Sequence, residues 1–135
     1  MAPLWDCILR AEYWDLVHCY ETALPGWLVL VARRHMAAID ELSEAEAAEL
    51  GPLLRRTSAA LRAVTSCLKT YVMQFAESPQ HPHMHFHVIP RMRDQPEDRK
   101  STLIFGYLGV PEPQRVSEEA MNAIALQVRE RLQTN

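Results

Sequence analysis

The amino-acid sequence predicts an α+β domain with a mainly antiparallel sheet, one long crossover helix and a C-terminal helix. Three observations support this prediction. Short apolar runs bounded by turn residues indicate strands, a long stretch of apolar residues at helical spacing separates two pairs of them, and a second helical pattern follows the last strand. Sequential strands joined by short turns, with one helical connection, are typical of α+β proteins. The chain has 135 residues, 48% of them hydrophobic and 23% charged, so we expect a single domain over 1–135.

The first pair of strands is predicted at 14–20 and 27–32, separated by the turn sequence Thr-Ala-Leu-Pro-Gly at 22–26. The run 27–32 is continuously apolar, which fits a central strand covered on both faces. The sequence Ser43-Glu44-Ala45-Glu46 has the capping-box pattern, and an apolar stripe follows at helical spacing through about residue 69. Because proline removes a backbone donor and crowds the preceding turn, Gly51-Pro52 predicts a kink or a restart in this helix.

The second pair of strands is predicted at 71–76 and 83–89, with Pro90 ending the latter. Residues 91–101 are rich in charge and predict a surface loop, and 102–108 predicts a short edge strand. The last helix is expected over 117–133, with Ser117 as its N-cap and two glutamates at the positive end of the helix dipole.

Composition excludes several functional classes. The net charge is −3 and the pI is near 6.1, so the chain lacks the basic balance of a protein that binds nucleic acid by charge. The apolar runs are far shorter than the roughly 20 residues that span a bilayer. The N-terminal residues lack the pattern of a secretory signal, and the three cysteines form no CxxC pair. We therefore expect a cytoplasmic protein with no membrane or nucleic-acid partner.

Four of the six histidines alternate along one short segment, at His81, His83, His85 and His87. A spacing of two on a strand points every imidazole to the same face, and sends the intervening apolar side chains of Met84, Phe86 and Val88 to the other. We expect the apolar face to pack against helices. The histidine face is then open and available for a site.

Two chemistries use such a row of imidazoles. Histidine is a common metal ligand, but positions i and i+4 of a strand lie about 13 Å apart, so one strand offers two ligands easily and three with difficulty. Alternatively, a neutral imidazole attacks phosphorus well and leaves well, and neighbouring imidazoles can donate hydrogen bonds to the phosphoryl oxygens. The second chemistry needs no metal, and we expect neither a metal site nor a cofactor.

The sequence resembles the histidine triad (HIT) superfamily, in which three histidines alternate with apolar residues. Here the motif is His83-Met84-His85-Phe86-His87-Val88-Ile89, followed by Pro-Arg. The strand that begins at Pro25-Gly26 and the helix entry at 39–46 are also similar, so the resemblance covers about 14–91. Starting the motif at His83 places an apolar residue in every apolar slot, which leaves His81 as an extra histidine.

The resemblance implies a HIT-like fold and a nucleotide hydrolase or nucleotidyl transferase. In catalytic relatives the middle histidine, here His85, attacks the α-phosphate and forms a nucleotidyl-histidine intermediate, and His83 and His87 are its flanking partners. The substrates implied include adenosine phosphoramidate and diadenosine polyphosphates. A nucleotide-binding module of the same fold with weak or no catalysis is the alternative, followed by a metalloprotein. The resemblance further implies a homodimer.

The chain departs from the family pattern at two places. Trp27 stands where relatives often have histidine, so an imidazole relay through that position is missing, and we expect a buried aromatic there. Glu77-Ser78-Pro79-Gln80 replaces a Gly-Gln element that supplies backbone donors to phosphate, and Pro79 has no N–H. Ser78 and Gln80 are therefore candidate substrate-binding residues by position, and Arg91 is a candidate for neutralising phosphate.

Overall fold

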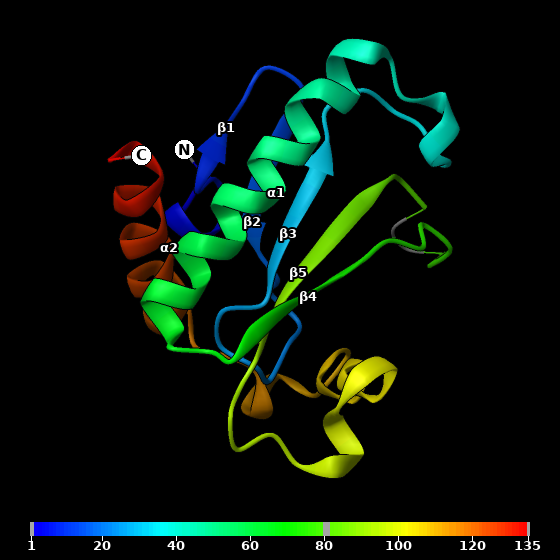
Figure 1. The fold of residues 1–135 in the computed structure, drawn as a ribbon. Coiled ribbons are helices and arrows are strands. Elements are labelled where there is room, and N and C mark those ends of the chain that lie inside the picture. The colour runs from blue at the N-terminus through cyan, green and yellow to red at the C-terminus, as the bar shows by residue number, and fades with distance from the viewer. Residues whose placement is uncertain (1, 80–81, 135) are drawn as a thin grey trace.

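The computed structural model describes residues 2–79 and 82–134, and it confirms an α+β fold (Figure 1). The sheet has five strands in the order β1-β2-β3-β5-β4, and all neighbouring strands are antiparallel. Helix α1 (Glu44–Thr65) crosses from β3 to β4, and α2 (Glu118–Gln133) follows at the C-terminal end. The strands are β1 (Leu9–Arg10), β2 (Trp14–His18), β3 (Leu28–Ala32), β4 (Lys69–Met73) and β5 (His85–Arg91).

The strands differ from the predicted ones at β1 and at the end of β5. β1 was not predicted, because its two residues are too few to give an alternation pattern in the sequence. β5 continues through Pro90 instead of ending before it. The carbonyl of Arg91 accepts the N–H of Leu68 on the β4 side, so the backbone of Pro90 faces the β3 side. The β3–β5 ladder has already ended there, at the pair Leu28–Val88, and the missing N–H costs no ladder bond.

The predicted edge strand at 102–108 is wrong, because Ser101–Tyr107 forms a 3₁₀ helix, η4. Ile104 is fully buried, whereas Leu103 and Gly106 are exposed. The two exposed residues are three apart, which is the period of a 3₁₀ helix and not the period of two of a strand. The apolar composition that suggested a strand instead serves to cover the sheet. Ile104 and Phe105 pack beside Trp27, on the face opposite the two long helices.

Helix α1 begins at the predicted capping box. The Oγ of Ser43 accepts the N–H of Glu46 at 3.1 Å, and the carboxylate of Glu46 accepts the N–H of Ser43 at 2.7 Å. The predicted restart is wrong, since the helix is continuous through Pro52. Pro52 and Ala48, whose carbonyl loses its partner, are both exposed, so water can satisfy that carbonyl. Within the two described ranges, neither this helix nor any other combines the length and apolarity that a membrane span requires.

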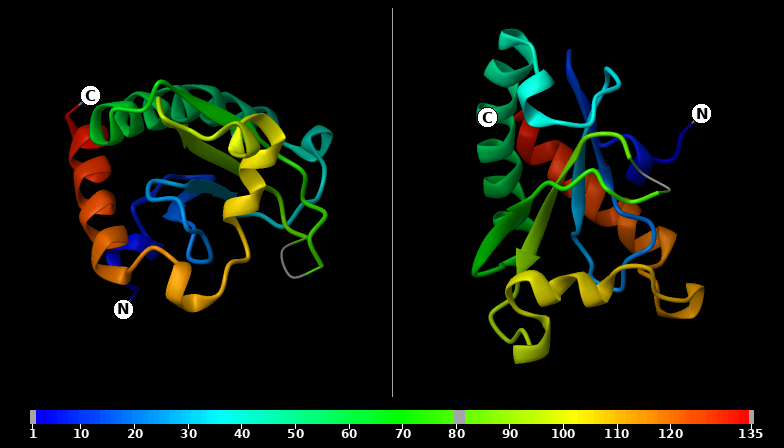
Figure 2. Two further views of the ribbon diagram at one scale, coloured as in Figure 1. Left: turned by 90° about the horizontal axis from the view of Figure 1, so that it is seen from below. Right: turned by 90° about the vertical axis from the view of Figure 1, so that its right-hand side faces the viewer.

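The sheet separates two apolar clusters. Both long helices cover one face (Figure 2), where alternate residues of β3 and β5 form the main core with Leu61 of α1 and Val128 of α2. The other face holds a smaller cluster of Leu24, Trp27, Val29, Ile89 and Ile104. The prediction that 27–32 is covered on both faces is confirmed for Trp27 and Val29, whereas Val31 on the same face is half-buried.

The turn before β3 is tightly constrained at Gly26. Its φ of +89° lies in the region that favours glycine, and a Cβ there would stand 3.0 Å from Cγ2 of Thr65. The N–H of Gly26 also donates to Nε2 of His18 at 3.0 Å. This turn fixes where Trp27, the next residue, enters the sheet.

We predict that Gly26→Ala lowers the free energy of unfolding by about 2 kcal/mol, from the positive φ and the contact with Thr65. Gly51→Ala is the matched control, because Gly51 lies in α1 with no neighbour within 4 Å of its added Cβ. Urea denaturation should find Gly51→Ala at least as stable as the original chain. Equal stability of the two variants would contradict this account of the turn.

Candidate active site

A cavity of about 340 Å³ opens on the histidine face of β5. Its floor is formed by His85 and His87 together with Val31 and Val29, the β3 residues that pair with them. Trp5, Tyr20 and Leu108 add apolar surface, and two carboxylates, those of Asp6 and Glu21, also lie in the lining. The alternation predicted from the sequence therefore places three imidazoles, His83, His85 and His87, against one largely apolar cavity.

His85 has one ring nitrogen engaged and one available. Its Nδ1 lies 2.8 Å from the carbonyl oxygen of His83, and a carbonyl can only accept, so Nδ1 carries the proton. Nε2 of the neutral ring then has a lone pair, and no described residue is hydrogen-bonded to it. A ring held by the backbone with a free lone pair on its other nitrogen has the features that a nucleophile requires.

His87 is held in the opposite tautomer. It is 8% exposed, and the indole Nε1–H of Trp27 donates to its Nδ1 at 3.0 Å. Burial, together with the neighbouring His85, lowers the pKa of His87 to about 4. The ring is neutral at physiological pH, and its proton resides on Nε2. The rings of His85 and His87 meet edge to face with centroids 4.9 Å apart.

Both ring nitrogens of His83 have partners. Nε2 is hydrogen-bonded to the carbonyl of Ala32, so it carries the proton, and Nδ1 accepts from Nδ1 of His35 at 3.0 Å. The two rings are stacked with centroids 5.1 Å apart. His83 thus anchors the start of β5 to the end of β3, and its carbonyl orients His85.

Two further cavity residues could in principle act as nucleophiles, His18 and Cys19. The Nδ1–H of His18 donates to the carbonyl of Cys19 at 2.7 Å, while its Nε2 accepts from Gly26. Burial lowers the pKa of His18 to about 4 and raises that of the Cys19 thiol to about 11, so the thiolate is absent at neutral pH. Among the described residues that line the cavity, His85 is the histidine whose lone pair is not taken by the protein.

Comparison with known proteins shows which family has this arrangement. A sequence model of the HIT domain matches residues 6–94, two thirds of the chain and all five strands of the sheet. The chain belongs to the HIT family. No curated protein matches the sequence significantly.

Solved HIT structures share the fold. A histidine triad protein from Bradyrhizobium japonicum superimposes with a TM-score of 0.76 at 21% identity, covering 93% of this chain and 89% of that one. A HIT protein from Sinorhizobium meliloti gives 0.74 at 22% identity, with coverage of 92% and 87%. The diadenosine triphosphate hydrolase of Plasmodium falciparum gives 0.69 at 13% identity, with coverage of 96% and 78%.

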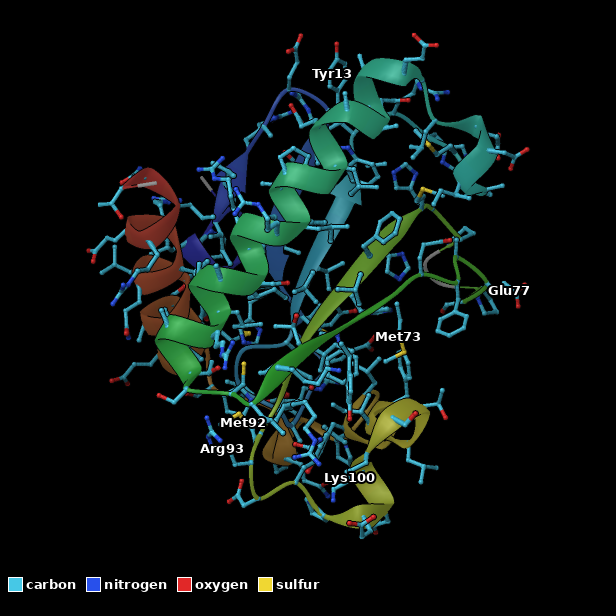
Figure 3. All side chains as sticks on the ribbon, in the orientation of Figure 1. Tyr13, Met73, Glu77, Met92, Arg93 and Lys100 are labelled. Carbon is cyan, nitrogen blue, oxygen red and sulfur yellow. The ribbon has the colours of Figure 1, made fainter. Side chains whose placement is uncertain are left out.

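Two other predicted site residues of this HIT protein, Arg91 and Ser78, lie outside the cavity lining. Arg91 is at the far end of β5 from His85, about 20 Å away at 3.3 Å per residue, and its Nη1 donates to the carbonyl of Met92. In Figure 3, Met92 and Arg93 mark that end of the sheet, whereas Glu77 marks the loop between β4 and β5. Ser78, in this loop, is exposed. Neither Arg91 nor Ser78 is among the described residues that line the cavity. Gln80 and His81 lie outside the described residues.

No group of three or more His, Cys, Asp or Glu side chains within the described ranges is arranged to hold a metal ion. His81 lies outside that search. Of the three described histidines in the row, His83 and His87 each have their lone pair bound by a donor, from His35 and Trp27, and His85 has its lone pair unbound.

Two contacts of His87 were not predicted from the sequence. Trp27 is fully buried, as expected, but its indole N–H fills the position where an imidazole relay was thought to be missing. The spacing of two from Trp27 to Val29 and from Val29 to Val31 could have indicated this contact, because alternate residues of a strand share a face and here that face is the one of the histidines. Phe105 packs against His87 with centroids 5.2 Å apart, and no local pattern could indicate this contact across 18 residues.

We predict that the protein loses stability between pH 6.5 and pH 4. Above pH 6.5 His18 and His87 are neutral in both states. Below pH 6.5 these two histidines become protonated in the unfolded chain, but in the folded chain they stay neutral until the pH reaches their pKa of about 4. The free energy of unfolding therefore falls as the pH is lowered, by up to about 3 kcal/mol for each histidine. Urea denaturation at pH 7.5 and pH 5 measures the loss.

His87→Gln should lessen this pH dependence by about half, since one of the two groups is removed. A free energy of unfolding that stays level from pH 7.5 to pH 5 would show that the two rings are not buried as neutral imidazoles.

Proposed function

We propose that this HIT protein is a nucleotide hydrolase or nucleotidyl transferase that acts at the α-phosphate through a covalent intermediate on His85. The observation that carries the proposal is that His85 lines the cavity with Nδ1 bound to the carbonyl of His83, which leaves the lone pair on Nε2 without a partner among the described residues. Family membership supports the same kind of activity.

The proposed reaction has two displacements. In the first, the lone pair on Nε2 of His85 attacks phosphorus, and the bond from phosphorus to the leaving nitrogen or oxygen breaks with its electron pair on the leaving group. In the second, water or another acceptor attacks phosphorus and gives up its proton to the leaving group of the first step or to solvent, and the P–Nε2 bond breaks with its electron pair on Nε2, which restores the imidazole. The ring carries positive charge in the intermediate, and the hydrogen bond from Nδ1–H to the carbonyl of His83 strengthens as that charge develops.

His87 is the proposed donor to the phosphoryl oxygens. Its ring lies beside that of His85, it is neutral, and its Nε2 carries a proton. A donor in a site of low water content stabilises the charge that gathers on these oxygens in the transition state. His83 has a different proposed part, because both of its ring nitrogens are engaged and its carbonyl positions His85.

The lining of the cavity favours a nucleoside with a single phosphate over a dinucleoside polyphosphate. Val17, Val29 and Val31 offer an apolar surface for a base, and Trp5 and Tyr20 are aromatic neighbours of it. The charged residues in the described lining are Asp6 and Glu21, with neither lysine nor arginine. Such a lining repels a chain of phosphates, whereas carboxylates can accept hydrogen bonds from ribose hydroxyls. We therefore place adenosine phosphoramidate before diadenosine polyphosphates.

Turnover of both substrate types, with and without chelator, separates this proposal from its alternatives. The proposed steps use a neutral imidazole as nucleophile, so turnover should persist in chelator. Nucleotide binding without turnover would favour the binding module instead, and loss of turnover on chelation would favour a metalloprotein. The cysteines in the structure are free thiols, which supports a reducing compartment such as the cytoplasm.

We predict that His85→Asn lowers turnover of adenosine phosphoramidate by about 10⁴-fold or more, because the nucleophile is lost. His87→Ala should cost about 10²–10³-fold, the typical effect of removing one donor to the developing charge. Steady-state kinetics measure both effects, and circular dichroism checks that the variants fold.

Two variants serve as controls for this series. His83→Ala keeps the backbone carbonyl that orients His85, so its loss should be smaller than that of His87→Ala. Arg91→Ala should stay within about threefold of the original chain, because Arg91 lies at the other end of β5. Full activity of His85→Asn, or a loss at Arg91 as large as that at His87, would refute the assignment.

We also propose a homodimer that forms along β4. This strand is an edge of the sheet, and apolar side chains on and near it are exposed, at 44% for Val72 and 56% for Phe75. An open edge with apolar neighbours readily pairs with a second copy.

Light scattering at micromolar concentration should give twice the 15.5 kDa mass of the chain. Val72→Lys should shift the protein towards the monomer, because it places a charge on the paired edge. Leu126→Lys is the control, since Leu126 is similarly exposed, at 47%, but lies on α2. A stable monomer of the original chain would remove the proposal.

A further inference from the structure

Trp27 is positioned more firmly than packing alone requires. It is fully buried and follows the constrained turn at Gly26, whose N–H is held by His18. Its ring meets those of His87 and Phe105 edge to face, with centroids 5.6 and 5.5 Å apart. The indole therefore has little freedom to rotate away from His87.

The hydrogen bond from Trp27 has a chemical consequence for His87. An indole nitrogen can donate but not accept, so the contact of 3.0 Å between Nε1 of Trp27 and Nδ1 of His87 requires a lone pair on Nδ1. A neutral imidazole has one lone pair and one N–H. The lone pair of His87 is thus consumed by Trp27, and the proton must reside on Nε2.

The surroundings of His87 keep it neutral. Phe105 covers the ring from η4, and the side chain is buried. A second proton would have to displace the Trp27 donor from Nδ1 and place a charge among aromatic rings, which burial opposes. The low pKa of His87 agrees with this geometry.

We propose that Trp27 is a positioning residue that fixes His87 as the Nε2–H tautomer, so that His87 acts as a hydrogen-bond donor and His85 is left as the nucleophile. This inference rests on the proposed function, since the donor acts on the phosphoryl group at His85. It explains how two adjacent imidazoles on one strand face take different parts: a carbonyl directs the lone pair of His85 into the cavity, and an indole N–H directs that of His87 away from it.

Nitrogen-15 NMR of the intact protein tests the tautomers without substrate. At pH 7 the original chain should show His87 protonated on Nε2 alone and His85 protonated on Nδ1. His87 protonated on Nδ1 would overturn the inference, and this measurement needs no variant to fold.

Trp27→Phe removes the N–H while keeping an aromatic ring. We expect the Nδ1–H tautomer of His87 to appear in the spectrum and kcat to fall about 10- to 100-fold, by analogy with the loss of a hydrogen-bond partner that orients a metal-bound histidine. The dissociation constant for AMP should stay within about threefold, because the cavity lining is retained.

Trp14→Phe is the matched control. Trp14 is also fully buried and donates its indole N–H, but to the carbonyl of Glu46 on the helix side of the sheet. This variant should lose stability and leave both the His87 spectrum and kcat unchanged. An unchanged His87 spectrum in Trp27→Phe, or a changed spectrum with unchanged kcat, would overturn the role given to Trp27. Absence of turnover in the original chain would overturn the proposed function and the catalytic role of His87. The nitrogen-15 spectrum of His87 decides independently whether Trp27 sets the tautomer.

Discussion

The division of β5 between two faces is the constraint on which the candidate site depends. Phe86 and Val88 are held in the main core beneath the two long helices, and a shift of one residue in register would exchange them with the histidines. Such a shift would bury imidazoles against leucines on one side and expose phenylalanine on the other. The apolar residues between the histidines therefore hold the triad in place as firmly as any contact that the imidazoles make themselves.

Within that frame, hydrogen bonds give His85 one tautomer and give His83 and His87 the other. Rings of one residue type on one strand would otherwise be interchangeable, with two tautomers each. Backbone carbonyls accept hydrogen bonds from Nδ1–H of His85 and Nε2–H of His83, while the lone pairs on Nδ1 of His83 and His87 accept from His35 and Trp27. Among the described histidines of this row, Nε2 of His85 is then the nitrogen whose lone pair has no partner in the protein. The site thus distinguishes its histidines by their partners rather than by their positions in the motif.

The sequence predicted the features that depend on local periodicity. The shared face of the histidines, the covered central strand and the capping box at Ser43 all follow from spacing, and all appear in the structure. It failed where distant contacts decide. Residues 101–107 have strand composition but cover the sheet as a 3₁₀ helix, and Arg91 follows the motif in sequence yet lies at the far end of its strand. The bond from Trp27 to His87 joins residues 60 apart and required the pairing of β3 with β5 to be known.

The central claim is that His85 alone becomes covalently attached to the nucleotide. Rapid quenching of the protein with adenosine phosphoramidate at neutral to alkaline pH, followed by peptide mass spectrometry, locates the attached nucleotidyl group. The account predicts the adduct on His85 and its disappearance as AMP is released. An adduct on His83 would shift the motif to begin at His81, and an adduct on His87 would contradict the tautomers that the hydrogen bonds assign.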